Sequence, residues 1–198
     1  MTRQWVALPA VVAVSLLLGG LTSSAQGLLP DAVASFANSP SGWTILTAAI
    51  VAATRPGLRA GAVLGVLSFV SLVLGCAIAS ELRGLTYDPV LWCIIGVLAG
   101  PPVGTAAAAL AGPHRTRASV GAGVLAGVFI ADGIYGLTVV DQSTSAVYWT
   151  ACIVAGIALV TVTASRFRSR TTTVTCVAST LASAAFLTAG YSVLNAIL

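Results

Sequence analysis

A run of twenty residues, Gly121–Val140, is apolar except for a single acid, Asp132, which lies well inside it. A helix of about 20 apolar residues is long enough to cross the hydrocarbon core of a bilayer. A carboxyl group at that depth is unfavourable by roughly 2.5 kcal/mol or more, so such residues usually have a specific partner or role. The run therefore constrains the chain to fold in a membrane, and Asp132 is the first candidate for a functional residue.

The composition extends this expectation to the whole chain. Of its 198 residues, 58% are hydrophobic and only 7% are charged, whereas a soluble domain carries about 25% charged residues. The length has room for about six or seven spans and for no separate soluble domain. We therefore expect an all-α protein, a polytopic transmembrane helix bundle, with residues 1–198 in a single transmembrane domain.

Seven apolar segments are expected to form spans. They are residues 5–21, 40–54, 60–82, 90–111, 119–140, 147–164 and 172–197. The second segment is the shortest, because fifteen helical residues extend only ~22 Å against a core of ~30 Å. We therefore predict seven spans, with six as the fallback.

Residues 22–39 are expected to lie on the membrane surface between the first two spans. Pro30 followed by Asp31 predicts the start of a short helix there. Ser39 is a candidate N-cap for the segment 40–54. Ser23-Ser24-Ala25 resembles a signal-peptide cleavage site, so a cleaved first segment is an alternative to a retained helix.

The charges predict the orientation of the bundle. The nine cationic residues are all Arg and are scattered in short connections, with no basic patch that would indicate a nucleic-acid partner. A cytoplasmic N-terminus and seven spans put eight of them inside and leave Arg83 outside, as the positive-inside rule requires. Trp5 then lies at an inner span end, and Trp43, Trp92 and Trp149 at outer ends, as in an aromatic belt. We predict a multi-pass protein of the cell (plasma) membrane.

Glycines recur at four-residue spacing in three of the expected spans. The sets are Gly57, Gly61 and Gly65; Gly96, Gly100 and Gly104; and Gly123 and Gly127. This spacing places each set on one helix face, where another backbone can approach closely. The glycine faces predict close packing within the chain. The alternative is that one face contacts a second copy or another membrane protein.

The fourth expected span contains a candidate helix break. Its residues are Gly100, Pro101, Pro102 and Gly104. Each proline lacks an amide donor, so the carbonyls of Val97 and Leu98 lose their intrahelical partners. Backbone left unpaired at membrane depth is tolerated in protein interiors and wet cavities, and broken spans often hold the substrate or ion sites of transporters. A simple packing kink is the alternative.

Asp132 and the predicted break are expected at the same depth. Counting equal distances from the turn near His114 puts Asp132 level with Val97. Asp132 could be protonated and donate to a carbonyl, share a cation with the carbonyls, or bind a cationic group of a substrate. Tyr135 lies on the same helix face as Asp132. The alternative is a polar anchor that locks two helices together.

Catalysis is not expected. Asp132 is the only acid in an expected span, and the sequence has no HExxH, Walker or dinucleotide motif. The four cysteines fall in apolar runs without CxxC spacing, and His114 is the only histidine. We therefore predict no enzyme activity, no cofactor and no metal.

Several short motifs resemble a family of small actinobacterial membrane proteins known only as a domain of unknown function. They are Ala25-Gln26-Gly27 with Leu29-Pro30, Ala37-Asn38-Ser39 ahead of Trp43, Ala99-Gly100-Pro101, and Asp132-Gly133. The resemblance implies no activity or ligand. It suggests that Gln26, Asn38 and Asp132 form a polar set at the outer end, and backbone capping is the alternative for the first two.

Two functional hypotheses follow. The first is a protein that binds or transports a small solute or cation between the fourth and fifth spans, with Asp132 as ligand, Tyr135 as hydrogen-bond donor, and the Val97 and Leu98 carbonyls as acceptors. The second is a membrane assembly or regulatory subunit that packs through its glycine faces. A wet cavity at Asp132 favours the first, and a dry, sealed Asp132 beside an exposed glycine face favours the second.

Overall fold

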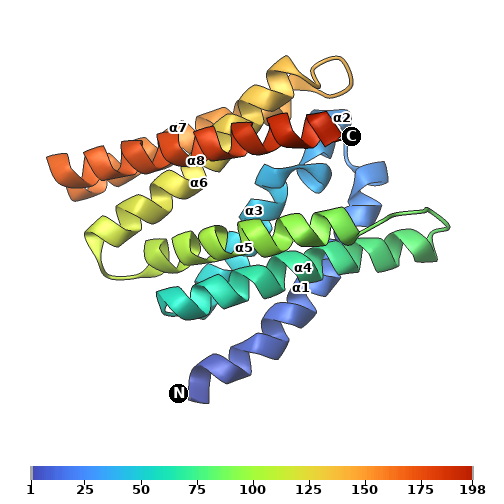
Figure 1. The fold of residues 1–198 in the computed structure, drawn as a ribbon, viewed down its shortest axis with the longest axis horizontal. Coiled ribbons are helices and arrows are strands. Elements are labelled where there is room, and N and C mark those ends of the chain that lie inside the picture. Colours follow the sequence, from blue (N-terminus) through green and yellow to red (C-terminus); the bar gives the residue numbers. More distant parts are fainter. Residues whose placement is uncertain (1, 198) are drawn as a thin grey trace.

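The computed structural model describes the backbone of residues 2–197 and the side chains of residues 7–196. All regular elements in that part of the chain are helices (Figure 1). They are α1 (Thr2–Leu28), α2 (Asp31–Ala34), the 3-10 helix η1 (Ser35–Asn38), α3 (Pro40–Thr54), α4 (Leu58–Leu82), α5 (Val90–Ala111), α6 (Arg115–Thr138), α7 (Ala146–Phe167) and α8 (Arg170–Ile197). The predicted all-α helix bundle is confirmed.

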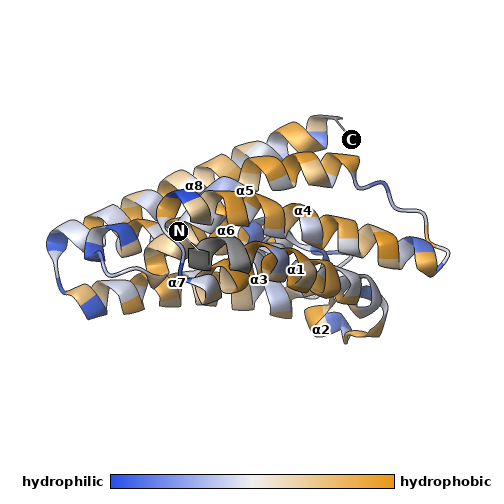
Figure 2. Ribbon diagram, turned by 90° about the horizontal axis from the view of Figure 1, so that it is seen from below, coloured by the Kyte–Doolittle hydropathy of each residue, from blue (hydrophilic) through white to orange (hydrophobic). Residues whose placement is uncertain are grey.

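Six of these helices, α1 and α4 to α8, are long and apolar enough to cross a membrane. The number matches the fallback of six. The seventh predicted span is present as the shorter apolar helix α3, whose 15 residues extend only ~22 Å. Figure 2 shows hydrophobic residues along the helices and hydrophilic residues gathered mainly at the connections.

The first helix is longer than predicted. It continues to Leu28 rather than ending near residue 21, because nothing interrupts it until Leu29, which precedes Pro30 and is disfavoured in a helix for that reason. The surface segment is correspondingly shorter than residues 22–39. The short helix predicted at Pro30-Asp31 is confirmed as α2, and Ser39 caps α3 by accepting a hydrogen bond from the amide of Gly42 at 3.1 Å.

The predicted break in α5 is wrong. Pro101 and Pro102 lie inside one helix, Val90–Ala111. Gly100 and Gly104 pack so closely on α4 that a methyl group on either would clash with backbone there. This packing holds the segment helical although two amide donors are missing from it.

Helices α1 and α4 run parallel. Ser15 Oγ lies 2.9 Å from Ser68 Oγ, and Ser23 Oγ lies 2.9 Å from Ser80 Oγ, so residue numbers rise together along both helices. Parallel neighbours in one chain need a return between them, and α3 is the helix that provides it. Helices α1 and α4 therefore run in one direction, which we call up, and α3 runs in the opposite direction, which we call down.

Helices α6 and α8 form a second parallel pair. A methyl group on Gly123 would meet the Cys176 carbonyl, one on Gly127 would meet the Thr180 carbonyl, and Ser183 Oγ donates to the Val124 carbonyl at 2.9 Å. Helix α7 runs antiparallel to α6. Figure 1 shows α6, α7 and α8 on one side and α1, α4 and α5 on the other. We call these groups the C-terminal bundle and the N-terminal bundle.

Helix α3 lies between the two bundles (Figure 1). Ala48 packs against the cluster that contains Val103 of α5 and Leu125 of α6, and Val51 packs with Leu64 of α4. The bundles also touch each other directly near the short turn between α5 and α6, where Gly121 of α6 packs on the Ala106 carbonyl of α5. That turn lies at the end of the molecule predicted to be cytoplasmic, which we call the inner end, and the start of α3 lies toward the opposite end, which we call the outer end.

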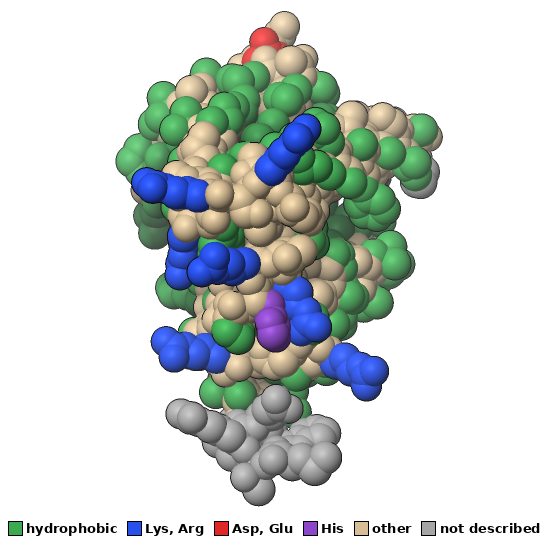
Figure 3. Space-filling view, turned by 90° about the vertical axis from the view of Figure 1, so that its left-hand side faces the viewer, with side chains coloured by type: hydrophobic (Ala, Val, Ile, Leu, Met, Phe, Trp, Pro, Cys, Tyr) green, Lys and Arg blue, Asp and Glu red, His purple; other side chains and the backbone are tan. Residues whose placement is uncertain are grey.

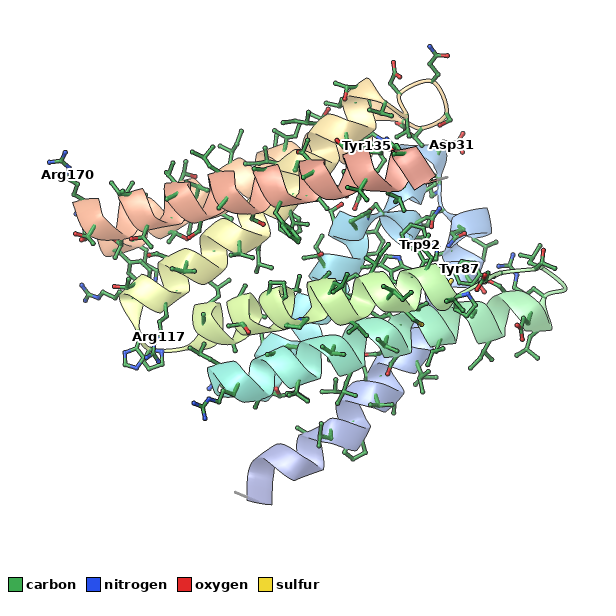
Figure 4. All side chains as sticks on the ribbon, in the orientation of Figure 1. Asp31, Tyr87, Trp92, Arg117, Tyr135 and Arg170 are labelled. Carbon is green, nitrogen blue, oxygen red and sulfur yellow. The ribbon has the colours of Figure 1, made fainter. Side chains whose placement is uncertain are left out.

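The charges divide between the two ends as the predicted orientation requires. Figure 3 views the inner end and shows Arg and His side chains across it, with acidic side chains only at the far edge. Figure 4 places Arg117 and Arg170 at this end and Asp31 and Tyr87 at the opposite end. The side chains of Arg3 and Trp5 lie outside the described residues.

The predicted aromatic belt is wrong for two of its members. Trp43 and Trp149 are buried, at 7% and 5% exposed. The Trp43 indole donates to the Ala37 carbonyl at 3.2 Å, and the Trp149 indole donates to Thr144 Oγ1 at 2.8 Å. Both rings therefore pack inside the outer half of the molecule, where their N–H groups find protein partners rather than lipid headgroups.

Candidate functional site

Asp132 is completely buried, at 0% exposed. It lies on α6 six residues before the end of that helix at Thr138, a distance of about 9 Å along the axis. The glycines beside it explain why the helix comes so close to its neighbour. A methyl group on Gly133 would meet the backbone of α7, and one on Gly136 would overlap the ring of Trp149.

Both carboxylate oxygens of Asp132 have donors. The backbone amide of Ser41 donates to Oδ2 at 2.8 Å, and the hydroxyl of Tyr191 donates to Oδ1. Ser41 is the second residue of α3, so Asp132 caps the N-terminus of that helix from another part of the chain. The positive end of the α3 dipole and two hydrogen bonds therefore stabilise the carboxylate within the bundle.

Three further side chains extend this contact. Tyr148 of α7 places its hydroxyl 2.8 Å from Ser39 Oγ and 2.7 Å from Ser41 Oγ, and Cys152 Sγ lies 3.4 Å from Ser41 Oγ. We call the complete set the α3 junction. Its members are Ser39, Ser41, Asp132, Tyr148, Cys152 and Tyr191. Each hydroxyl in the junction has a partner, as buried polar groups require.

The junction joins the two bundles. Among the described residues, every side-chain hydrogen bond between α3 and the C-terminal bundle involves Ser39 or Ser41. Other side-chain hydrogen bonds, such as that between Ser15 and Ser68, stay within one bundle. The N-terminal bundle is thus linked to the C-terminal bundle by this polar cluster toward the outer end and by the apolar packing of α5 on α6 toward the inner end.

The Tyr135 hydroxyl is not one of the donors to Asp132. The ring of Tyr135 stacks on that of Tyr191, with 3.8 Å between ring centroids, and its hydroxyl donates to Asn195 Oδ1 at 3.2 Å. Figure 4 shows Tyr135 near the end of α8, on the same end of the molecule as Asp31. The prediction placed Tyr135 on the correct side of α6. Its contact with Asp132 runs through Tyr191, which the sequence did not indicate.

The predicted contact between Asp132 and α5 is wrong. The side chains of Val97 and Leu98 are 51% and 67% exposed on the outer surface of α5, and the donors found on Asp132 come from α3 and α8. The prediction placed Asp132 level with Val97 by counting residues from the α5–α6 turn. This placement brings the two residues together only if α5 and α6 stay in contact along their whole length. The two helices diverge because α3 packs between them.

Gln26 and Asn38 do not belong to the site. The Gln26 amide donates to the Ala37 carbonyl at 3.4 Å, which supports η1, and Asn38 is exposed at the end of η1. The alternative expected from the sequence for these two residues is backbone capping. The structure shows this alternative for Gln26. Of the junction, only Asp132 and the cap Ser39 were singled out from the sequence. Ser41, Tyr148, Cys152 and Tyr191 carry no recognisable spacing.

The connection between α4 and α5 also lies toward the outer end and packs on α3 and α4. Tyr87 packs with Trp92 against the cluster formed by Trp43, Phe69 and Leu72. Burial raises the pKa of the Tyr87 phenol, so this hydroxyl stays neutral. Among the described residues, no group of three or more His, Cys, Asp or Glu side chains is arranged to hold a metal ion.

The model of the Family of unknown function (DUF6518) matches residues 1–197. The chain belongs to this family. The resemblance inferred from the short motifs is therefore confirmed, and it extends over more of the chain than those motifs do. No curated protein and no solved structure matches the chain. The family assignment agrees with an integral membrane protein and supplies no ligand or reaction.

Proposed function

We propose that this integral membrane protein of the plasma membrane binds and moves a small solute or cation between its two bundles. The α3 junction is the outer closure of that path. The observation that carries the proposal is the concentration of the polar contacts between the bundles in one buried cluster built around a carboxylate. The proposal includes no catalytic step and no cofactor.

A buried carboxylate at membrane depth supports this proposal. Such residues are unfavourable in a bilayer and are commonly found on ion, proton or substrate pathways. Transporters also place helix ends at membrane depth, with N-termini directed at anionic groups. Here the recessed N-terminus of α3 is directed at Asp132. Opening the junction would free both the carboxylate and the first amides of α3.

Each residue then has a role. Asp132 is the ligand for the cation, proton or cationic group of the solute. Tyr191 holds the carboxylate while the path is closed, and Tyr135, stacked on it, lies between Asp132 and the outer end. The Ser41 amide binds Asp132, so that a cation or proton on the carboxylate weakens the attachment of the α3 N-terminus.

A second candidate is a membrane assembly or regulatory subunit that transports nothing. The observation in its favour is that Asp132 is fully buried and has protein donors on both oxygens, so the junction is satisfied without a ligand. The glycine faces cannot provide its partner surface, because Gly61, Gly65, Gly104, Gly123 and Gly127 pack on backbone of the same chain.

Cys152 provides a test of the two candidates. It is 5% exposed and contacts Ser41, so an opening of the junction exposes its thiol. The chain is prepared with Cys76, Cys93 and Cys176 changed to Ala. Modification by a small, membrane-impermeant thiol reagent is timed with and without Asp132→Asn. We expect the substitution to speed labelling by up to about fivefold, because a neutral amide binds the α3 N-terminus more weakly than a carboxylate does.

The matched control keeps Cys176 as the only cysteine. This thiol is 0% exposed and lies where α8 packs on α6, away from the junction. Its labelling should be slow with either residue at position 132. Equal protection of Cys152 and Cys176 in both backgrounds would favour the subunit. Reconstituted vesicles loaded with a proton- or potassium-sensitive dye then measure whether ion movement depends on Asp132.

A further inference from the structure

A pocket lies at the inner end of the molecule, away from the α3 junction. It encloses about 110 Å³ where the connection between α3 and α4, the end of α5 and the start of α6 meet. Its lining residues are Pro56, Gly57, Leu58, Ala108, Ala109, Gly112, Pro113, His114 and Arg117. Three separate parts of the chain thus form one concave site, which no step of the proposed transport uses.

The polar side chains of this pocket are hydrogen-bond donors. Arg117 carries a fixed positive charge and a planar set of N–H groups, and His114 has a ring N–H. Arg59 and Arg115 are exposed at the same end. The face seen in Figure 3 carries Arg and His side chains, with acidic side chains only at its far edge. An anion that enters this pocket meets no acidic side chain in its lining.

The backbone adds to this preference. Helices α4 and α6 both begin at the pocket, and neither has a side-chain cap. Their positive dipole ends therefore face the same space as Arg117. Nothing lies within 4 Å of the position where a side chain on Gly57 would begin, so a ligand can approach the backbone there.

The remaining walls are apolar. Ala108 and Ala109 are buried and form the floor, and Leu58 and Pro113 lie at the sides. A cationic rim over an apolar wall at the end of transmembrane helices suits an amphiphile with an anionic head better than a freely dissolved ion. Anionic lipids are concentrated in the cytoplasmic leaflet, and basic pockets between helices on that side bind their headgroups.

We infer that this pocket binds the phosphate of an anionic phospholipid headgroup from the inner leaflet. Arg117 pairs with the phosphate oxygens, and His114 and the first amides of α4 and α6 donate to them. The acyl chains continue along the apolar surface of the neighbouring helices. The pocket includes the α5–α6 turn, so a bound lipid joins the inner ends of the two bundles. This lipid site shares no residue with the α3 junction, so it does not depend on the proposed transport function.

The test uses the full chain purified in a neutral detergent. Native mass spectrometry measures retention of phosphatidylglycerol, with phosphatidylcholine as the neutral-lipid arm and inorganic phosphate as the competitor. We expect phosphatidylglycerol to bind and Arg117→Gln to weaken its binding by about tenfold, because a charge-assisted bond to phosphate is lost. Arg170→Gln is the matched control, since Arg170 lies at the same end but does not line the pocket.

The outcomes separate the possible sources of the phosphate. Phosphatidylglycerol binding that millimolar phosphate does not displace supports a lipid headgroup. Displacement by phosphate, with the same loss in Arg117→Gln, assigns the pocket to a free phosphate and overturns the lipid assignment. Equal effects of Arg117→Gln and Arg170→Gln would show a general effect of surface charge and overturn the site. Thermal unfolding of both variants without lipid confirms that each is folded.

Discussion

Asp132 has two roles that depend on the same atoms. Its Oδ2 accepts from the Ser41 amide and its Oδ1 accepts from Tyr191, so one side chain satisfies a helix end and a phenol inside the bundle. Losing the acceptor here leaves a buried amide and a half-buried hydroxyl without partners, which is more unfavourable than replacing the whole contact by apolar groups. Stability should therefore depend on whether position 132 can still accept a hydrogen bond.

We predict that Asp132→Ala destabilises the protein by about 2 kcal/mol or more, because the Ser41 amide and the Tyr191 hydroxyl both lose their acceptor. Asp132→Asn keeps one acceptor oxygen and should be destabilised by less than about 1 kcal/mol. Unfolding in mixed detergent micelles, followed by tryptophan fluorescence, measures both. Asp141→Ala, at an exposed position in the α6–α7 connection, is the control and should change little. Equal destabilisation by Ala and Asn would contradict the hydrogen-bonding role.

Part of this site could be predicted from the sequence. An acid inside a twenty-residue apolar run is visible as it stands, and a Ser before Pro40 marks the start of a helix. Tyr191 lies on α8, 59 residues after Asp132 in the sequence. No periodic pattern in the sequence predicts that these two residues meet. Whether Asp132 is a ligand or a structural anchor also depends on where α3 packs. The position of α3 was the least certain part of the prediction, because its segment is the shortest of the seven.

At the scale of elements, glycine determines which helices touch. Gly61 and Gly65 of α4 interlock with Gly100 and Gly104 of α5, with too little room for a methyl group. In a bilayer, close backbone approach and the van der Waals contacts it permits replace the hydrophobic effect as the source of helix association. The spacing predicted such close packing. It did not indicate that the prolines in α5 would be accommodated within an unbroken helix.

Two glycine-to-alanine substitutions should therefore have very different effects on stability. In Gly65→Ala the new methyl would lie 2.1 Å from the Gly100 carbonyl oxygen, which forces α4 and α5 apart. We expect a destabilisation of about 1–3 kcal/mol, typical of overpacking. Gly190→Ala is the matched control, because nothing lies within 4 Å of the added methyl, and Ala favours a helix by up to about 1 kcal/mol. Similar melting temperatures for the two variants would contradict the interlocked packing.

On the scale of the whole molecule, two sets of three consecutive long or apolar helices share one order of directions. Helices α1, α3 and α4 run up, down and up with the first and third parallel, and α6, α7 and α8 do the same. Helix α5 connects the two sets. Parallel repeats of this kind are one way in which transporter folds are built. The sequence shows no internal repeat, because helix direction and pairing are set by packing and leave no fixed residue pattern.

This arrangement requires α3 to bring the chain back across the membrane although it is short. The prediction is tested with single cysteines at the two ends of α3, Asn38→Cys and Gly57→Cys, in a chain whose native cysteines are Ala. Both positions are exposed. Ser143→Cys in the α6–α7 connection and Ser169→Cys in the α7–α8 connection are the reference positions for the outer and inner sides.

We expect an impermeant thiol reagent to label Asn38→Cys and Ser143→Cys in intact cells, and to label Gly57→Cys and Ser169→Cys only after the membrane is opened. The reason is that α1 and α4 are parallel, so the end of α1 and the start of α4 face opposite sides. The eight arginines predicted inside then share the side of Gly57. Labelling of Gly57→Cys from outside would mean that α3 returns to the surface it came from, and the order up, down, up would be lost.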